Sequence, residues 1–194
     1  MFKSSIFSSI YSNICKTKKH DINLNYLNTI NKNVNYDKID GNIIKTFFKR
    51  EQFDEELYSI FILEEIKLNI VPEILTIDDN NSVIKYNTNN LVSLRSILLT
   101  NNLNYIINEL FSFIKEIKNY KVTIGNLHVD NIYINIKTME FFIIDLININ
   151  FDKEENNIDF ESLSLSLNSN YFNSIGHITT SENNIINNII DFYM

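Results

Sequence analysis

The chain has 194 residues and a net charge of −7, from 17 basic and 24 acidic side chains. Its hydrophobic content of 44% is enough for a packed core and argues against a disordered chain. The acidic excess excludes a general nucleic-acid surface, which would need clustered Lys and Arg. The one basic cluster is Lys16, Lys18, Lys19 and His20, which we interpret as a solvated surface segment.

Nothing in the sequence indicates secretion or a membrane span. Ser and Asn interrupt the apolar run at the N-terminus, and no apolar stretch reaches the roughly 18 residues that a span needs. The single cysteine, Cys15, excludes an internal disulfide and fits a reducing compartment. We therefore expect an intracellular, cytoplasmic protein. The 35 Ile and 33 Asn, with no Ala, are typical of an A/T-rich viral or parasitic genome, which would mean the host cytoplasm if viral.

The N-terminal half is predicted to be a poorly defined extension, residues 1–35, followed by a small β-rich lobe with one helix, residues 36–90. The helix is predicted over 51–67, where apolar residues recur at helical spacing and acidic residues crowd the positive end of the helix dipole. The strands predicted here are Asn42–Phe48, Glu73–Ile77 and Ser82–Tyr86. The first follows the turn pair Asp40-Gly41, and a polar turn joins the other two.

The C-terminal half, residues 91–194, is predicted to be mainly helical. A short helix around Leu91–Leu99 precedes a long amphipathic helix over 103–118. Strands at Ile132–Ile136 and Phe141–Leu146 then form a hairpin. Further helices are expected at 159–167 and 184–193. This order favours an α+β fold with two lobes.

A resemblance to a known family is carried by the hairpin region. The run Leu127-His128-Val129-Asp130-Asn131-Ile132, followed by Ile143-Ile144-Asp145, resembles the catalytic loop and metal-binding segment of the protein-kinase-like superfamily. The Leu-His-x-x-Asn variant is most similar to haspin-type kinases and aminoglycoside phosphotransferases. The resemblance covers roughly residues 40–165. It implies a two-lobed kinase-like fold with a reduced N-terminal β lobe and a truncated helical C-terminal lobe.

The resemblance also implies a nucleotide site with ATP and Mg²⁺ as cofactors. Asn131 and Asp145 match the metal ligands, and both offer the hard oxygens that Mg²⁺ prefers. Lys45 resembles the strand lysine that contacts nucleotide phosphates, and Glu56 the helix glutamate that pairs with it, with Glu55 as the adjacent candidate. His128 matches the loop histidine, which supports the loop or the substrate side. The alternative for each residue is an ordinary structural role.

Several positions depart from the family pattern. Asn126 stands five residues before Asn131, where the resemblance places the catalytic base, and a carboxamide cannot take a proton. Asp130 is not expected to replace it. No glycine-rich phosphate loop precedes Lys45, where Gly41 is the only candidate. Ile124 replaces the histidine that opens the loop, and only 49 residues follow Asp145, too few for a full kinase large lobe.

Three hypotheses follow. The preferred hypothesis is a pseudokinase that acts by binding another protein. Such a protein would at most bind nucleotide and Mg²⁺, without transferring phosphate. The second is an active, minimal ATP-dependent phosphotransferase, acting on Ser/Thr of a protein or on a small molecule. The third is a small α+β interaction protein with no nucleotide. Whether the protein is an enzyme is left open, and the expected partner is a protein, not a nucleic acid.

Overall fold

The computed structural model describes residues 31–98, 103–125 and 127–151, together with Leu24, Leu27, Asn28 and Leu163. Asn126 therefore lies outside the described residues. So do most of the predicted extension 1–35 and the predicted tail helices at 159–167, apart from Leu163, and 184–193.

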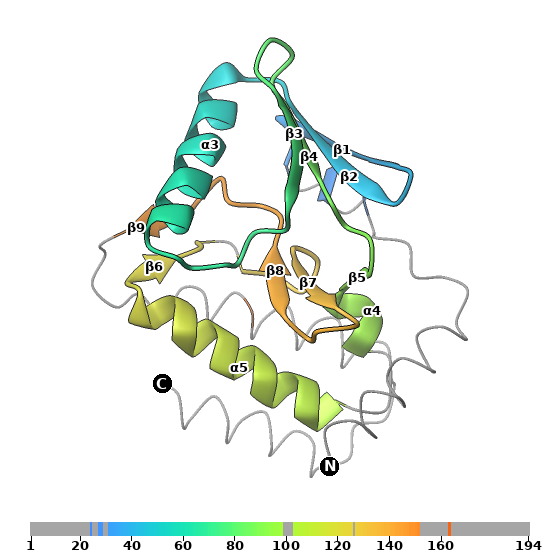
Figure 1. The fold of residues 1–194 in the computed structure, drawn as a ribbon, viewed down its shortest axis with the longest axis vertical. Coiled ribbons are helices and arrows are strands. Elements are labelled where there is room, and N and C mark those ends of the chain that lie inside the picture. The colour runs from blue at the N-terminus through green and yellow to red at the C-terminus, as the bar shows by residue number, and fades with distance from the viewer. Residues whose placement is uncertain are drawn as a thin grey trace.

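The N-terminal lobe is a four-stranded antiparallel sheet with one helix beside it (Figure 1). Its strands are β1 (Val34–Ile39), β2 (Asn42–Phe47), β3 (Ile74–Asp78) and β4 (Val83–Tyr86), in the order β1-β2-β4-β3. The helix is α3 (Arg50–Glu65). The predicted helix and the three predicted strands are confirmed, each within two residues at either end.

Strand β1 was not predicted, because it is an edge strand with little apolar character. Only Val34 and Tyr36 bury side chains, while residues 37–39 are exposed. On its outer edge the Asn28 carboxamide replaces a further strand. The Asn28 nitrogen donates to the Tyr36 carbonyl at 3.2 Å, and the Tyr36 N–H donates to the Asn28 oxygen at 2.7 Å. These bonds satisfy backbone groups that an open edge would leave unpaired.

The connection between β1 and β2 is a turn of two residues. Asp40 and Gly41 have φ values of 52° and 78°, as expected for an Asp-Gly hairpin turn. The Thr88 hydroxyl donates to the Gly41 carbonyl at 2.6 Å. A Cβ on Gly41 would lie 2.6 Å from Oδ1 of Asn89. Gly41 is thus required by a tight turn that packs on the segment after β4.

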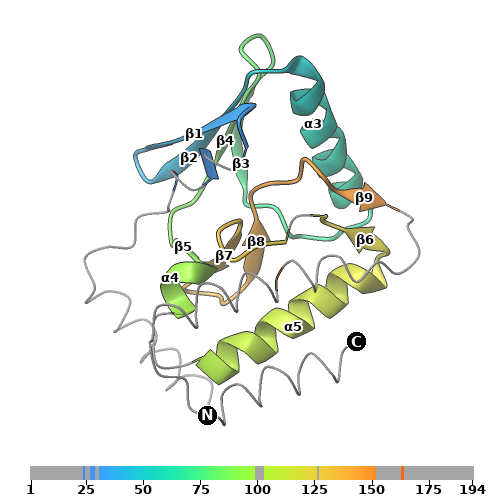
Figure 2. The same cartoon turned by 180° about the vertical axis from the view of Figure 1, so that it is seen from behind.

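The second lobe is built around a three-stranded antiparallel sheet, in the order β5-β7-β8, and a long helix (Figure 2). Its elements are β5 (Leu91–Ser93), α4 (Leu94–Leu98), α5 (Leu103–Asn119), β6 (Val122–Thr123), β7 (Ile132–Asn135), β8 (Phe141–Ile143) and β9 (Asn150–Phe151). Strands β6 and β9 form a separate pair. The helix predicted over 103–118 and the β7–β8 hairpin are confirmed.

Two predictions in this lobe were wrong in detail. Residues 91–93 are a strand and not the start of a helix, because they pair with residues 133–135 of β7. That pairing joins segments about forty residues apart, so tertiary contact overrides the local apolar pattern. The strand predicted over Phe141–Leu146 ends at Ile143, and the chain then bends away from the sheet.

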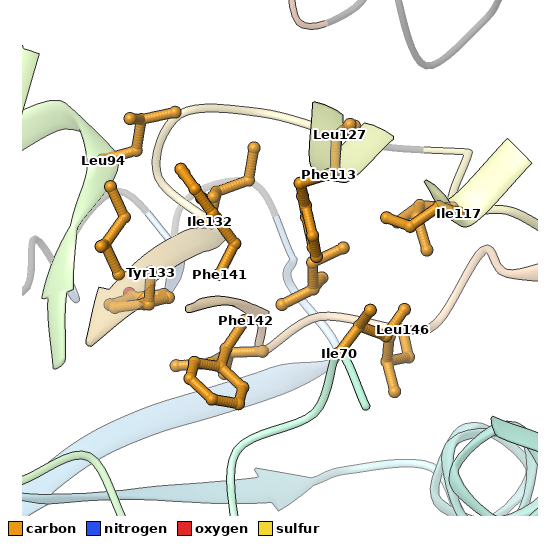
Figure 3. Close-up of a cluster of buried hydrophobic side chains, with 14 of the residues drawn as sticks. Ile70, Leu94, Phe113, Ile117, Leu127, Ile132, Tyr133, Phe141, Phe142 and Leu146 are labelled. Carbon is orange, nitrogen blue, oxygen red and sulfur yellow. The ribbon is translucent and has the colours of Figure 1, made fainter. Parts of the chain in front are cut away.

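The hairpin is fixed between α5 and the segment that follows α3. Figure 3 shows the side chains of this buried cluster, including Phe113 and Ile117 from α5 and Phe141 and Phe142 from β8. The Phe113 and Phe141 rings stack with their centroids 5.3 Å apart. The Ile143 N–H donates to the Ile70 carbonyl at 2.7 Å, which links the second sheet to the segment between α3 and β3 of the first lobe.

The described elements form an α+β fold with two lobes, as the sequence predicted, and its N-terminal β lobe is reduced to four strands. No helix among the described residues combines the length and apolar character needed to cross a membrane.

Two glycines should differ in how well they tolerate a side chain. Both Gly41 and Gly125 have a φ of 78°, which costs other residues about 1–2 kcal/mol. A Cβ on Gly125 would also lie 2.6 Å from the backbone oxygen of Asn148, whereas the neighbour of Gly41 is a side-chain atom that can move. We expect Gly125→Ala to lower the free energy of unfolding more than Gly41→Ala, measured by urea denaturation. Equal losses would contradict this packing.

Candidate functional site

Lys45 points into the core because of its place in β2. Side chains alternate between the two faces of a strand, and Lys45 shares its face with Ile43 and Phe47, both buried. The side chain is fully buried. A buried ammonium group needs partners of opposite charge or strong acceptors, because burial removes its hydration.

Glu56 is the first of these partners. Two residues separate the end of β2 from the start of α3, and helical spacing places Glu56 on the inward face with Phe53 and Ile60. Its Oε2 lies 2.6 Å from Nζ of Lys45. Of the two glutamates that the sequence left as candidates, Glu56 contacts the lysine and Glu55 is exposed.

Asp145 is the second partner, from a residue one hundred positions away along the chain. Its Oδ1 lies 3.0 Å from Nζ of Lys45, which also donates to the Ile144 carbonyl at 3.4 Å. Two more bonds bind Glu56 into the same cluster. Tyr86 donates its hydroxyl to Oε1 at 2.8 Å, and the Leu146 N–H donates to Oε2 at 3.4 Å. The cluster thus joins β2, α3, β4 and the segment after β8.

The cluster holds one cation between two carboxylates. Burial alone would lower the pKa of Lys45, but the charges of Asp145 and Glu56 outweigh burial and raise that pKa above its ordinary value. Burial raises the pKa of Glu56, Lys45 lowers it, and the neighbouring Asp145 charge adds to the rise. Lys45 therefore stays charged at physiological pH and faces two carboxyl groups.

Two aromatic rings border the lysine. Nζ lies 5.3 Å from the centroid of the Tyr36 ring and 5.0 Å from that of Phe47, both within cation–π distance. Tyr36 is opposite Lys45 in the β1–β2 register. Its hydroxyl is buried and has no hydrogen-bond partner within the described part of the chain. A buried hydroxyl without a partner offers a place for a ligand oxygen or a water molecule.

Asn131 lies next to Asp145 through the hairpin backbone. The Ile144 N–H donates to the Asn131 carbonyl at 3.2 Å. Asp145, the next residue, therefore lies directly beside the loop that carries Asn131. The side chain of Asn131 is buried, and its Oδ1 accepts the His128 N–H at 2.9 Å. This bond orients the carboxamide, whose oxygen is of the type that can coordinate a cation.

Asp130 forms an ion pair with Arg95 and contacts His128. Arg95 of α4 contacts both of its carboxylate oxygens, through Nε at 2.5 Å and Nη2 at 2.6 Å, and Nδ1 of His128 lies 3.0 Å from Oδ2. Burial would raise the pKa of Asp130, but the bonds from Arg95 and His128 outweigh burial and lower it. Asp130 therefore remains ionised and is a poor proton acceptor.

The chemical groups that the described residues offer match those that a nucleotide with bound Mg²⁺ requires. Lys45 can neutralise phosphate charge, Asn131 and Asp145 supply hard oxygens, and the Tyr36 hydroxyl has no hydrogen-bond partner among the described residues. No group of three or more His, Cys, Asp and Glu residues gathers as a metal site in the described ranges. Mg²⁺ would accordingly be held by two protein ligands together with phosphate oxygens, which is its usual mode of binding.

The sequence interpretation missed three residues of this region: Tyr36, Tyr86 and Arg95. The tyrosines carry no signal, because their role depends on which strands pair. Arg95 does carry one, since the chain has only two arginines among 17 basic residues. Both arginines make several hydrogen bonds to acidic residues, as Arg50 does with Asp54 and Asp79. In a chain whose other basic residues are all lysines, an arginine indicates a site that uses the several N–H donors of its planar guanidinium group.

Comparison with known proteins identifies the fold. No protein-family model and no curated protein sequence matches the chain. Among solved structures, the Rio2 kinase from Chaetomium thermophilum, crystallised as an ADP/Mg²⁺-phosphoaspartate complex, matches with a TM-score of 0.50 and 11% identity. The match covers 81% of this chain and 61% of the Rio2 chain, so this chain spans less than two thirds of that protein.

The choline kinase LicA from Streptococcus pneumoniae also matches, with a TM-score of 0.44 and 13% identity, over 81% of this chain and 77% of that chain. At such low identity the Rio2 match shows the fold and nothing finer. The chain has a reduced, two-lobed protein-kinase-like fold, as its loop and hairpin motifs led us to expect.

Removing Lys45 should destabilise the protein far more than neutralising Glu56. Lys45→Met leaves two carboxylates buried without a cation, a loss of about 3–5 kcal/mol. Glu56→Gln leaves a one-to-one pair of Lys45 and Asp145 and an oxygen that still accepts from Tyr86. We expect less than half the loss for Glu56→Gln in urea denaturation at pH 7. Similar losses for the two variants would disprove the charge assignment.

The pair of Arg95 and Asp130 should contribute stability that depends on pH. Because the pKa of Asp130 is lowered by folding, its contribution is present above the ordinary Asp pKa of about 3.9 and is lost as pH falls through the lowered value. Arg95→Met should cost about 2 kcal/mol at pH 7, since the arginine is partly exposed.

The difference from wild type should narrow below about pH 4, as followed by chemical denaturation across pH. Arg50→Met is the matched control, because its ion pairs are exposed and their loss should be smaller. A cost of Arg95→Met that stays constant down to pH 2 would refute this account.

Proposed function

We propose that this protein is a pseudokinase, a kinase-like protein that transfers phosphate poorly or not at all and acts by binding another protein. The observation that carries the proposal is the state of Asp130. It is the only carboxylate in the sequence from 124 to 131, and it is buried in an ion pair with Arg95 and a contact with Nδ1 of His128. The position of the base is Asn126, whose carboxamide cannot accept a proton.

Phosphoryl transfer has three requirements, and the chain meets them unevenly. The reaction needs a cation on the phosphates, oxygen ligands for Mg²⁺ and a group that orients the incoming hydroxyl. Lys45 supports the first, and Asn131 and Asp145 the second. Nothing described supports the third, because Asp130 would first have to leave Arg95. Loss of a general base typically costs ~10²–10⁴-fold in rate.

An active, minimal phosphotransferase is the second candidate. It is favoured by the contact of Lys45 with Glu56, the pairing that a phosphate-binding lysine makes with a helix glutamate. Positioning and Mg²⁺ can supply much of the acceleration without a base. ATP and Mg²⁺ would serve both candidates, with Lys45 on the phosphates, Glu56 holding that lysine and His128 supporting the loop. The ADP and Mg²⁺ in the Rio2 complex support this cofactor choice.

The test combines binding with transfer. Thermal unfolding with and without Mg²⁺-ATP measures binding, since a ligand of the native state raises its stability. Transfer is measured with radiolabelled ATP, by autophosphorylation and by release of phosphate. The variants are Asn126→Asp, which restores a carboxylate at the position of the base, and Asp145→Ala, which removes a metal ligand.

We expect wild-type protein to show no transfer, and we expect any transfer that appears to require Asn126→Asp. Wild-type transfer that Asp145→Ala abolishes would overturn the proposal and favour the active phosphotransferase. A wild type that is neither stabilised by millimolar Mg²⁺-ATP nor active would support a binding role and reject the cofactors.

A further inference from the structure

Helix α3 exposes a second face that the cluster around Lys45 does not use. Two large aromatic residues on it are open to solvent, Tyr58 with 62% and Phe61 with 56% of its surface. The exposed carboxylates of the helix that form no ion pair with any described residue are Glu51, Glu55, Glu64 and Glu65. The exposed side of α3 is therefore both acidic and aromatic.

Helical spacing places these side chains together. Tyr58 and Phe61 are three residues apart and so are neighbours on the helix surface. Glu51 and Glu65 each lie two turns from Tyr58, one on either side, on the same face. The inward face carries Phe53, Ile60 and Leu63 against the core, and Figure 1 shows α3 at the side of the molecule with its other side away from the sheet. The aromatic pair is thus flanked by negative charge along the helix.

An apolar cavity adjoins this face at the C-terminal end of the helix. Its volume is about 710 Å³, and its apolar lining includes Ile60, Leu63, Leu68, Val71, Pro72 and Phe142. Glu64 lines the cavity and follows Phe61 by three residues, so Phe61 is a neighbour on the helix surface of one residue at the cavity. None of Lys45, Glu56 and Asp145 lines it, so it is separate from the candidate nucleotide site.

We propose that this surface, the outer face of α3 with the adjoining cavity, is the docking site for a basic segment of a partner protein. The segment would insert an apolar side chain beside the aromatic pair and place its cations against the carboxylates. Aromatic residues dominate the energetic centres of protein interfaces, and complementary charge selects the partner. The same charge repels nucleic acids and anionic lipid surfaces. The inference rests on the proposed function only in taking binding as the protein's role.

Fluorescence anisotropy with a defined probe tests the surface. The probe is a labelled synthetic peptide composed of Lys, Leu and Phe, and the control peptide has Glu in place of each Lys. The protein variants are Tyr58→Ala/Phe61→Ala and Glu51→Lys/Glu55→Lys/Glu65→Lys. Matched controls are Tyr120→Ala and Glu116→Lys, which alter an exposed tyrosine and an exposed glutamate of the other lobe. Thermal unfolding checks that every variant is folded.

We expect the double alanine variant and the triple lysine variant each to weaken binding of the basic peptide at least about tenfold. Added salt should weaken wild-type binding in the same direction. If the double alanine variant bound the basic peptide as tightly as Tyr120→Ala does, the proposed docking site would be wrong. Equal affinity of wild type for the Glu peptide, or unchanged binding by the triple lysine variant, would overturn the basic partner. Because none of these residues lies in the cluster around Lys45, a failure here leaves the result of the phosphate-transfer test unaffected.

Discussion

The contact of Lys45 with Glu56 and Asp145 is the interaction on which the rest of the structure depends. A fully buried ammonium group is tolerable only when carboxylates surround it, and here the two come from different lobes. Helix α3 must stand close to β2 to bring Glu56, and the segment after β8 must reach the sheet to bring Asp145. The charge requirement of one side chain thereby fixes how the two halves of the fold meet.

Such a cluster serves binding as readily as catalysis. It holds the features that a nucleotide would need, while Asp130, the carboxylate that could have replaced a base, is used by Arg95 to attach the loop to α4. The ion pair of Arg95 and Asp130 thus holds the loop in place, and it occupies a carboxylate that an active enzyme would keep free. The two-lobed fold is retained in this arrangement, and the exposed face of α3 is the surface that we propose for a partner.

Much of this fold could be predicted from the sequence because its signals are local. The period of apolar residues in α3 and α5 indicates both helices, and the apolar runs indicate β2 and the β7–β8 hairpin. Strand β1 escaped prediction because half of it is exposed, and residues 91–93 because their partner strand is about forty residues away. Lys45, Glu56, Asn131 and Asp145 were singled out by resemblance. Tyr36 and Tyr86 were not, since only strand pairing brings Tyr36 to Lys45 and Tyr86 to Glu56.

By itself the sequence determined the type of fold and the residues that carry charge into its interior, and it placed a carboxamide at Asn126. Periodicity and motif spacing are properties of short segments, so they survive without coordinates. The tertiary structure alone decided that Glu56 and not Glu55 meets Lys45, that Asp130 is bound by Arg95, and that Gly41 belongs to a tight turn. These outcomes depend on which side chains become neighbours across distant segments, and only the packed chain specifies that.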